Sequence, residues 1–286
     1  MKQIVLLIIA LGSSAIFLNA QTTVSGNQKG IWTFANSPYI VNGTVTVKAG
    51  DTLTIQPGVV VQMPSVFLGT PPTISVEGKL TAVGTSTQRI NFKADKYTAG
   101  NNTSGPITIQ ASSLNSKIEY ATFDSLGASW IGSNSASLIV NSLTCNINNC
   151  IFQNTSGTAL ILNVPTQKLN NNSFFYNSYL DVSTNPDNIR NIVGSNPLRF
   201  GLLSGMAAND TLTSYNTSYR LLQEVRVPTG KTLTIQPGVQ LIFPDYFILG
   251  GVLTIQGSLK AIGTTTNPIK FTGDHTSSSY SNGPIT

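Results

Sequence analysis

The sequence predicts an all-β fold in which short strands wind into a solenoid. Three observations lead to this prediction. Apolar and polar residues alternate through most of the chain, the octapeptide Thr-Leu-Thr-Ile-Gln-Pro-Gly-Val occurs twice, and similar segments between its two copies recur at intervals in the low twenties. Alternation places one face of each strand in a core, and segments that recur at a fixed interval are typical of repeat proteins whose units stack.

The N-terminal segment has the features of a secretory signal peptide. Lys2 supplies a positive charge, residues 4–18 are largely apolar, and Ala20 precedes a polar stretch. A transmembrane helix needs about 20 continuous apolar residues, and this run is shorter and is interrupted by serines. We expect cleavage after Ala20, an exported chain and no transmembrane span after cleavage. The alternative is an uncleaved N-terminal anchor.

The expected organisation has four parts. They are the signal peptide (1–20), an N-terminal capping segment (21–37), a first β-helical segment (38–187) and a truncated second copy of it (188–286). Trp32 lies in the capping segment, where it is expected to plug the open end of the solenoid, because repeat folds need capped ends.

The clearest strands follow the capping segment, and each is short, rich in β-branched residues and ended by Gly or Pro. They are Thr44–Val47, Thr52–Ile55, Val59–Val61, Thr73–Val76 and Lys79–Ala82.

The two copies of the octapeptide mark a longer duplication. Residues 52–59 and 232–239 are identical, and the match extends upstream to Tyr39 and Tyr219. Downstream it reaches Thr108 and Thr286, so that it covers about seventy residues. Because Thr286 corresponds to a position within a predicted strand, we expect the chain to be a fragment of a longer protein.

Shorter coils fill the region between the copies. Phe123, Phe152 and Phe175 stand in similar contexts at spacings of 29 and 23 residues. The triplets Leu138–Val140 and Leu160–Leu162 are 22 residues apart. Such spacings fit one turn of a three-strand solenoid whose apolar side chains stack inside. Asn at the turns tolerates a left-handed backbone, and stacked Asn side chains can form ladders between coils.

These segments carry a resemblance to a known family. Residues 39–58, 76–80, 84–85 and 90–92 resemble the opening coils of right-handed parallel β-helix repeat proteins of the pectate-lyase-like superfamily, which are secreted and abundant in Bacteroidetes-type bacteria. The resemblance implies a right-handed parallel β-helix for most of the mature chain. The superfamily includes lyases, hydrolases, epimerases and adhesins, so the resemblance leaves the activity open.

Charge and motifs argue against several classes of function. The chain has 16 Lys and Arg against 11 Asp and Glu, a net charge of +5, but the basic residues are scattered, which is not typical of nucleic-acid binding. No two acids are adjacent or two residues apart, whereas Ca²⁺-dependent lyases need clustered carboxylates and hydrolases need paired ones. The sequence therefore predicts no catalytic, cofactor or metal site.

The resulting functional prediction is a secreted or cell-surface scaffold, non-enzymatic, in adhesion or in contact with glycan or matrix. Its expected partner is an extracellular polysaccharide or cell-surface glycan. The alternative is a polysaccharide lyase or glycoside hydrolase whose active site lies mostly outside this fragment.

Two equivalent loops carry the candidate site residues. Asp95 and Tyr97 in the first loop, and Asp274 and Tyr280 in the second, could stack on a sugar and hydrogen-bond to it. The alternative is that both loops are solvated insertions that bind nothing.

The two cysteines, Cys145 and Cys150, are five residues apart. In an exported protein an even number of cysteines suggests a disulfide. The alternative is two separate thiols, buried or in turns.

Overall fold

The fold is almost entirely β. The structure, a computed structural model, describes residues 21–67, 69–95, 102–128, 136–164, 168–193, 199–214, 218–244, 251–273 and 285. Within these ranges the only helical segments are two 3₁₀ turns, η1 (Phe34–Asn36) and η2 (Pro186–Asn191). The predicted all-β class is confirmed. The signal peptide predicted at 1–20 lies outside the described residues.

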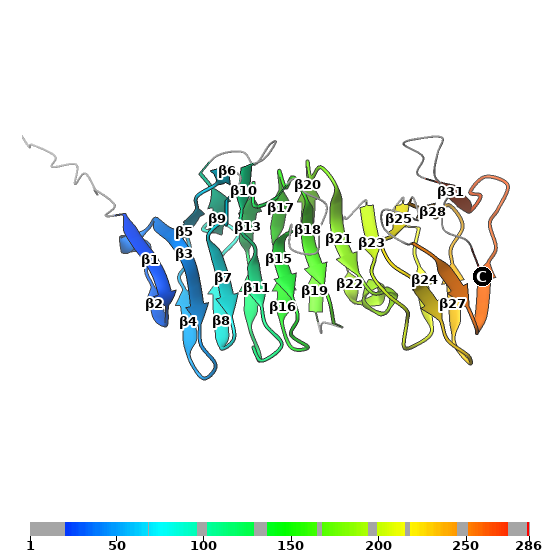
Figure 1. Cartoon of the computed structure of the whole chain (residues 1–286), viewed down its shortest axis with the longest axis horizontal. Helices are drawn as coiled ribbons and strands as arrows, with labels where there is room; N and C mark the ends of the chain where they lie inside the picture. The colour runs from blue at the N-terminus through cyan, green and yellow to red at the C-terminus, as the bar shows by residue number, and fades with distance from the viewer. Residues whose placement is uncertain are drawn as a thin grey trace, which may run out of the picture.

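The largest sheet runs the length of the molecule (Figure 1) in the order β20-β17-β13-β9-β5-β3-β7-β11-β15-β18-β21-β23-β25-β28-β31, with β1 paired to β3, and all of its pairings are parallel. Its strands are β1 Thr22–Asn27, β3 Tyr39–Val47, β5 Val60–Met63, β7 Thr73–Val76, β9 Ile90–Ala94, β11 Ile107–Ile109, β13 Ala121–Asp124, β15 Ala136–Val140, β17 Ile151–Gln153, β18 Thr158–Leu162, β20 Ser173–Phe175, β21 Leu180–Thr184, β23 Arg199–Leu202, β25 Ser218–Leu221, β28 Gln240–Phe243 and β31 Lys270–Gly273.

Further parallel sheets complete the circuit. The second contains β2 Gly30–Trp32, β4 Thr52–Ile55, β8 Lys79–Val83, β12 Lys117–Glu119, β16 Asn146–Asn148, β19 Lys168–Asn170 and β22 Ile192–Val193. The second copy contributes β24 Asp210–Leu212, β27 Thr232–Ile235 and β30 Ser258–Ala261, and a separate pair, β26 Val225–Val227 and β29 Leu253–Ile255. One small antiparallel sheet joins β6 Val66–Phe67, β10 Asn102–Ser104 and β14 Gly127–Ala128.

The chain winds in successive circuits, and β3 is shared by two faces of the largest sheet. The first half of β3 pairs with β5, Tyr39 opposite Val61, and its second half pairs with β7, Val45 opposite Ile74. Successive strands such as β7, β8 and β9 therefore lie on three faces, and β11, β12 and β13 pair with them one circuit later. We call one such circuit a coil.

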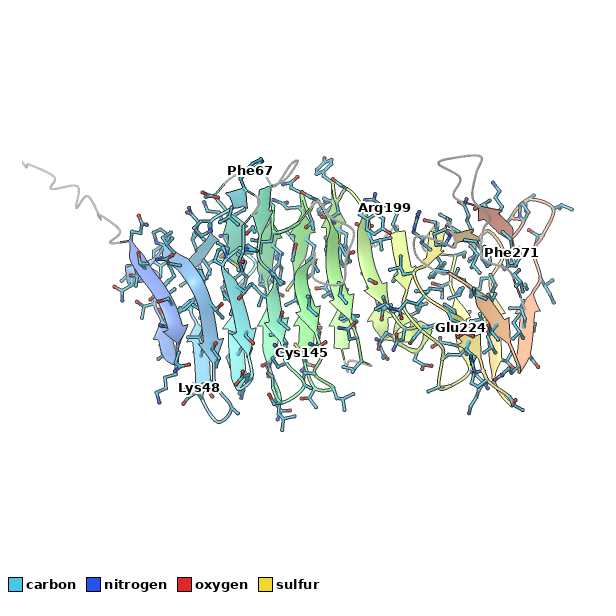
Figure 2. All side chains as sticks on the ribbon, in the orientation of Figure 1. Lys48, Phe67, Cys145, Arg199, Glu224 and Phe271 are labelled. Carbon is cyan, nitrogen blue, oxygen red and sulfur yellow. The ribbon has the colours of Figure 1, made fainter. Side chains whose placement is uncertain are left out.

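Inward side chains of consecutive coils stack into a single core. One row, in register and at most 2% exposed, consists of Val45, Ile74, Ile107, Leu138, Leu160 and Val182. Burial of each such side chain contributes about 1.5–3 kcal/mol. The pairing of Leu138 with Leu160 confirms the predicted 22-residue spacing. Side chains fill the space between the faces and also cover the outside of the molecule (Figure 2).

A second row contains stacked phenylalanines and corrects one prediction. Phe92, Phe123, Phe152 and Phe174 follow one another with ring centroids 5.1, 4.6 and 5.1 Å apart. The spacing predicts Phe175 in this row, but Phe175 is 42% exposed and Phe174 is buried. The coil is 22 residues long here rather than 23, and a register shift of one residue moves a side chain to the opposite face.

Single left-handed residues turn the chain between faces. Asn149 and Asn171 do so at one corner, with φ of 55° at each, and Asn154 at the next, with φ of 56°. Asn tolerates this region better than most residues because its short side chain can hydrogen-bond locally. The expectation that Asn residues mark the turns is thus confirmed.

The two copies share hydrogen bonds as well as sequence. The backbone N–H of Thr33 donates to the Tyr39 hydroxyl at 2.8 Å, and that of Thr213 donates to the Tyr219 hydroxyl at 3.1 Å. Trp32 is 4% exposed and stacks on Tyr39 with ring centroids 4.6 Å apart. The duplication therefore begins upstream of Tyr39, where the two sequences no longer match closely.

Candidate functional site

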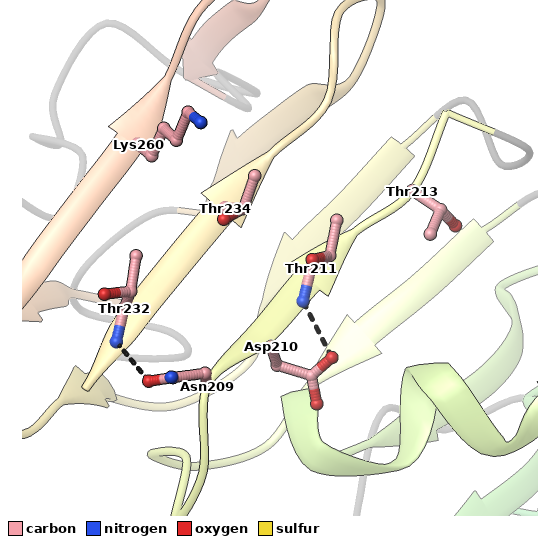
Figure 3. A pocket seen from close by; sticks show the side chains of 7 residues that line it. All are labelled: Asn209, Asp210, Thr211, Thr213, Thr232, Thr234 and Lys260. Carbon is pink, nitrogen blue, oxygen red and sulfur yellow. Dashed lines mark hydrogen bonds between the residues drawn. The ribbon is translucent and has the colours of Figure 1, made fainter.

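The outer face of the β24-β27-β30 sheet carries a hollow of about 530 Å³ (Figure 3). We call it the threonine hollow. All of its lining side chains can hydrogen-bond, and they are Asn209, Asp210, Thr211, Thr213, Thr232, Thr234 and Lys260.

Strand alternation explains why hydroxyl groups gather there. Thr211, Thr234 and Lys260 are in register on three neighbouring strands. The apolar residues that alternate with the threonines along β24 and β27, namely Leu212, Leu233 and Ile235, are buried in the core. Neighbouring strands lie about 4.7–4.9 Å apart, so the outward groups form a regular polar array.

Two lining side chains are held by backbone hydrogen bonds, drawn in Figure 3. The Asn209 Oδ1 accepts from the N–H of Thr232 at 2.8 Å, and the Asp210 Oδ1 accepts from the N–H of Thr211 at 2.7 Å. Asp210 is only 7% exposed, whereas Lys260 is exposed. Asp210 lies on the inward side of β24, in register with Leu233, so the groups that the hollow presents to solvent are the threonine hydroxyls, the Asn209 amide and the Lys260 ammonium group.

The first copy has the same strands with different outward residues. Ile31, Thr54 and Thr81 occupy the positions of Thr211, Thr234 and Lys260. Ile31 is 61% exposed, so the first copy presents an apolar side chain to solvent where the second presents a hydroxyl. The inward Leu53 and Ile55 of the first copy recur as Leu233 and Ile235, and the inward Trp32 is replaced by Leu212. The two copies have therefore diverged on the surface while their cores stayed apolar.

Of the four residues predicted to contact a glycan, the structure describes Asp95. Its Oδ1 accepts from the backbone N–H of Ser65 at 2.7 Å, and its side chain is exposed. Tyr97, Asp274 and Tyr280 lie outside the described residues, so glycan contact by this set stays a prediction.

Two acidic side chains elsewhere accept hydrogen bonds from amides of an adjacent coil. Asp124 Oδ2 accepts from Gln153 at 2.8 Å, and Glu119 Oε1 accepts from Asn148 at 3.4 Å. In the part of the chain that the structure describes, no three or more His, Cys, Asp or Glu residues are grouped so that they could hold a metal ion.

Both cysteines are free thiols buried in the core, which is the second of the two alternatives raised by the sequence. The Cys150 Sγ donates to the carbonyl oxygens of Asn148 and Ile118 at 3.4 and 3.5 Å. Burial raises the pKa of Cys145 to about 12, with a further contribution from Cys150, and burial likewise raises the pKa of Cys150 to about 12.

These pKa values predict a loss of stability in alkaline solution. Above the ordinary thiol pKa of 9.0 the unfolded chain loses these protons, whereas the native chain keeps them until about pH 12. The unfolded state then binds fewer protons, so the free energy of unfolding falls by about 1.4 kcal/mol per pH unit for each thiol. Urea unfolding should show little change below pH 8, a growing loss through pH 9 and this full slope between about pH 10 and 11. The double variant Cys145→Ala, Cys150→Ala should lack it, and an equal slope in both proteins would contradict the assignment.

The threonine hollow was not predictable from sequence, because threonine at outward strand positions is common. A signal was present in the comparison of the copies, since Lys260 stands where the first copy has Thr81. Thr211 lies upstream of the duplication that the sequence reveals, so its counterpart Ile31 becomes recognisable only from strand pairing.

No family model, curated protein or solved structure matches this chain. Among the described residues, no helix is long and apolar enough to span a membrane.

Proposed function

We propose that this protein is a right-handed parallel β-helix of the pectate-lyase-like type that is secreted or held on the cell surface. There it acts as a non-enzymatic scaffold in adhesion, contacting glycan or matrix through its outer faces. Export is proposed from the sequence of residues 1–20.

The observation that carries this proposal is the threonine hollow. Glycans present many hydroxyl groups, each of which needs a donor or acceptor when it leaves water. The hollow supplies hydroxyls from Thr211 and Thr234, and these threonines lie on paired strands rather than on loops. A site on rigid strands loses little conformational entropy on binding, which favours affinity for an extended ligand.

Exchange of residues between the two copies tests the proposal. In the variant Thr211→Ile, Lys260→Thr, the hollow acquires the side chains of the first copy, which the same strands already accommodate. We expect retention on insoluble glycans to fall about tenfold, equal to about 1.4 kcal/mol of binding free energy, with an unchanged thermal midpoint. Affinity electrophoresis and pull-down on a glycan panel provide the measurement.

The matched control is Thr81→Lys, which places the lysine in the first copy and should leave retention unchanged. Equal retention of wild type and hollow variant would contradict glycan contact at this surface. Release of products from pectin or alginate, with or without Ca²⁺, would instead favour a lyase or hydrolase.

A further inference from the structure

Two adjacent aromatic rings project from the edge of the largest sheet at the end of β20. Phe175 is 42% exposed and Tyr176 is 85% exposed, and their ring centroids are 6.5 Å apart with the planes tilted by 40°. Phe174, the residue before them, is buried in the phenylalanine row. The chain therefore supplies one ring to the core and two more to the surface, where large apolar side chains gain little from folding.

Tyr176 is exposed and also has a left-handed backbone conformation. Its φ is +54°, and the residues at the same corner of the two preceding coils, Ser125 and Asn154, have φ of 57° and 56°. A left-handed conformation suits a short polar residue and is unfavourable for a bulky one. The third coil thus keeps an exposed tyrosine where asparagine would fit with less strain, and such strain is characteristic of functional positions.

A fixed polar surface adjoins the two rings. Gln153 pairs in register with Phe175 on one side and with Asp124 on the other. The Asp124 carboxylate accepts from the Gln153 and Asn154 amide groups, at 2.8 Å each. Because their NH₂ groups are directed to this carboxylate, both amides have oriented carbonyl oxygens, which accept no hydrogen bond from the other described residues.

We infer that Phe175 and Tyr176, together with the amides of Gln153 and Asn154, form a binding site for neutral saccharide rings. The apolar C–H face of a pyranose packs on the aromatic rings, and its hydroxyl groups donate to the amide oxygens. The Asp124 carboxylate disfavours an anionic sugar at this position. The site rests on the proposed function for its ligand class, but it lies on another face and uses other residues than the threonine hollow.

The preceding coil supplies the variant for the test. The double variant Phe175→Gln, Tyr176→Asn gives this coil the Gln-Asn sequence that the preceding coil has at residues 153–154. It also removes the strained tyrosine. We expect retention on cellulose, xylan and mannan to fall about tenfold or more. The thermal midpoint should stay the same or rise, because asparagine relieves the backbone. Tyr176→Phe keeps the ring and should retain most of the binding.

Controls separate this site from the threonine hollow. Phe67→Ser removes a different exposed ring, 67% accessible on β6, and should leave binding unchanged. The hollow variant Thr211→Ile, Lys260→Thr, whose retention is expected to fall through loss of the hollow, should keep the part of neutral-glycan retention that the rings provide and lose it when the ring substitutions are added. Should both variants bind neutral glycans like wild type, both proposals fail. Unchanged neutral binding in the ring variant alone overturns this inference, and so does a large drop in its thermal midpoint, which would make the rings structural.

If the ring variant proves insoluble, a titration of the wild-type protein with soluble cello- and manno-oligosaccharides decides the question. Binding at Tyr176 should change tyrosine fluorescence in the wild type and in Phe67→Ser, but less in Tyr176→Phe. No change in the wild type at millimolar sugar would overturn the site.

Discussion

Replacement of Phe123 by alanine is expected to lower the free energy of unfolding by about 3–5 kcal/mol. Phe123 is fully buried and stands between Phe92 and Phe152, with ring centroids 5.1 and 4.6 Å away. Its removal forfeits both the buried area of one ring and two stacking contacts. Because the neighbouring coils are held apart by paired strands on three faces, the cavity cannot collapse fully, which places the cost at the upper end of the range.

Urea unfolding monitored by circular dichroism measures this effect. Phe67→Ala is the matched control, since Phe67 is 67% exposed and its loss should change stability by no more than about 0.5 kcal/mol. If Phe123→Ala lowered the free energy of unfolding by less than about 1 kcal/mol, the coils would have to close around the cavity. The stacked rings would then contribute little to holding the coils together.

The strands of the first copy were predictable because burial imposes a period of two on them. The predicted Thr52–Ile55 and Thr73–Val76 coincide with β4 and β7. Each has two inward side chains that must be apolar and two outward ones that need not be, and Pro-Gly or Gly follows. Gly58 shows why glycine follows these strands. Its φ of +79° is a left-handed conformation that glycine adopts readily.

The register of the third phenylalanine was not predictable from spacing. Phe174 and Phe175 are equally apolar, so sequence alone does not tell a 22-residue coil from a 23-residue one. The left-handed turns at Asn171 and Tyr176 fix which ring points inward, and a tyrosine in that conformation is not expected from its intrinsic preference. The proposed saccharide site at Phe175 and Tyr176 therefore lies where the backbone conformation differs from the one that tyrosine prefers.

The threonine hollow depends on the junction between the copies, which sequence reasoning did not resolve. At this junction the chain forms the 3₁₀ turn η2 between β21 and β22. Polar residues cluster there, including Asn188, whose side-chain amide donates to Thr184 Oγ1 at 2.8 Å. Buried polar groups have no periodic pattern, since each is satisfied by a specific partner distant in sequence.

Replacement of Asp187 by alanine is expected to cost about 2–4 kcal/mol of unfolding free energy. Asp187 lies in η2 and is 6% exposed. Its Oδ2 accepts from the N–H of Ala207 at 2.6 Å and its Oδ1 from that of Ala208 at 3.1 Å. Alanine would remove two hydrogen bonds to a charged acceptor, each of which contributes about 1.5–3 kcal/mol, and partial exposure of Ala207 and Ala208 to water lowers the sum.

Asp187→Asn should be intermediate, because one amide oxygen can still accept from one of the two N–H groups. Asp51→Ala is the control, since Asp51 forms an exposed ion pair with Lys29 at 3.3 Å that is worth about 0–1 kcal/mol. Ala208 directly precedes Asn209 of the threonine hollow, so the junction also positions the proposed glycan surface. Asp187→Ala should therefore weaken glycan retention as well as stability. Wild-type unfolding in this variant would show that the loop before β24 is held by other contacts.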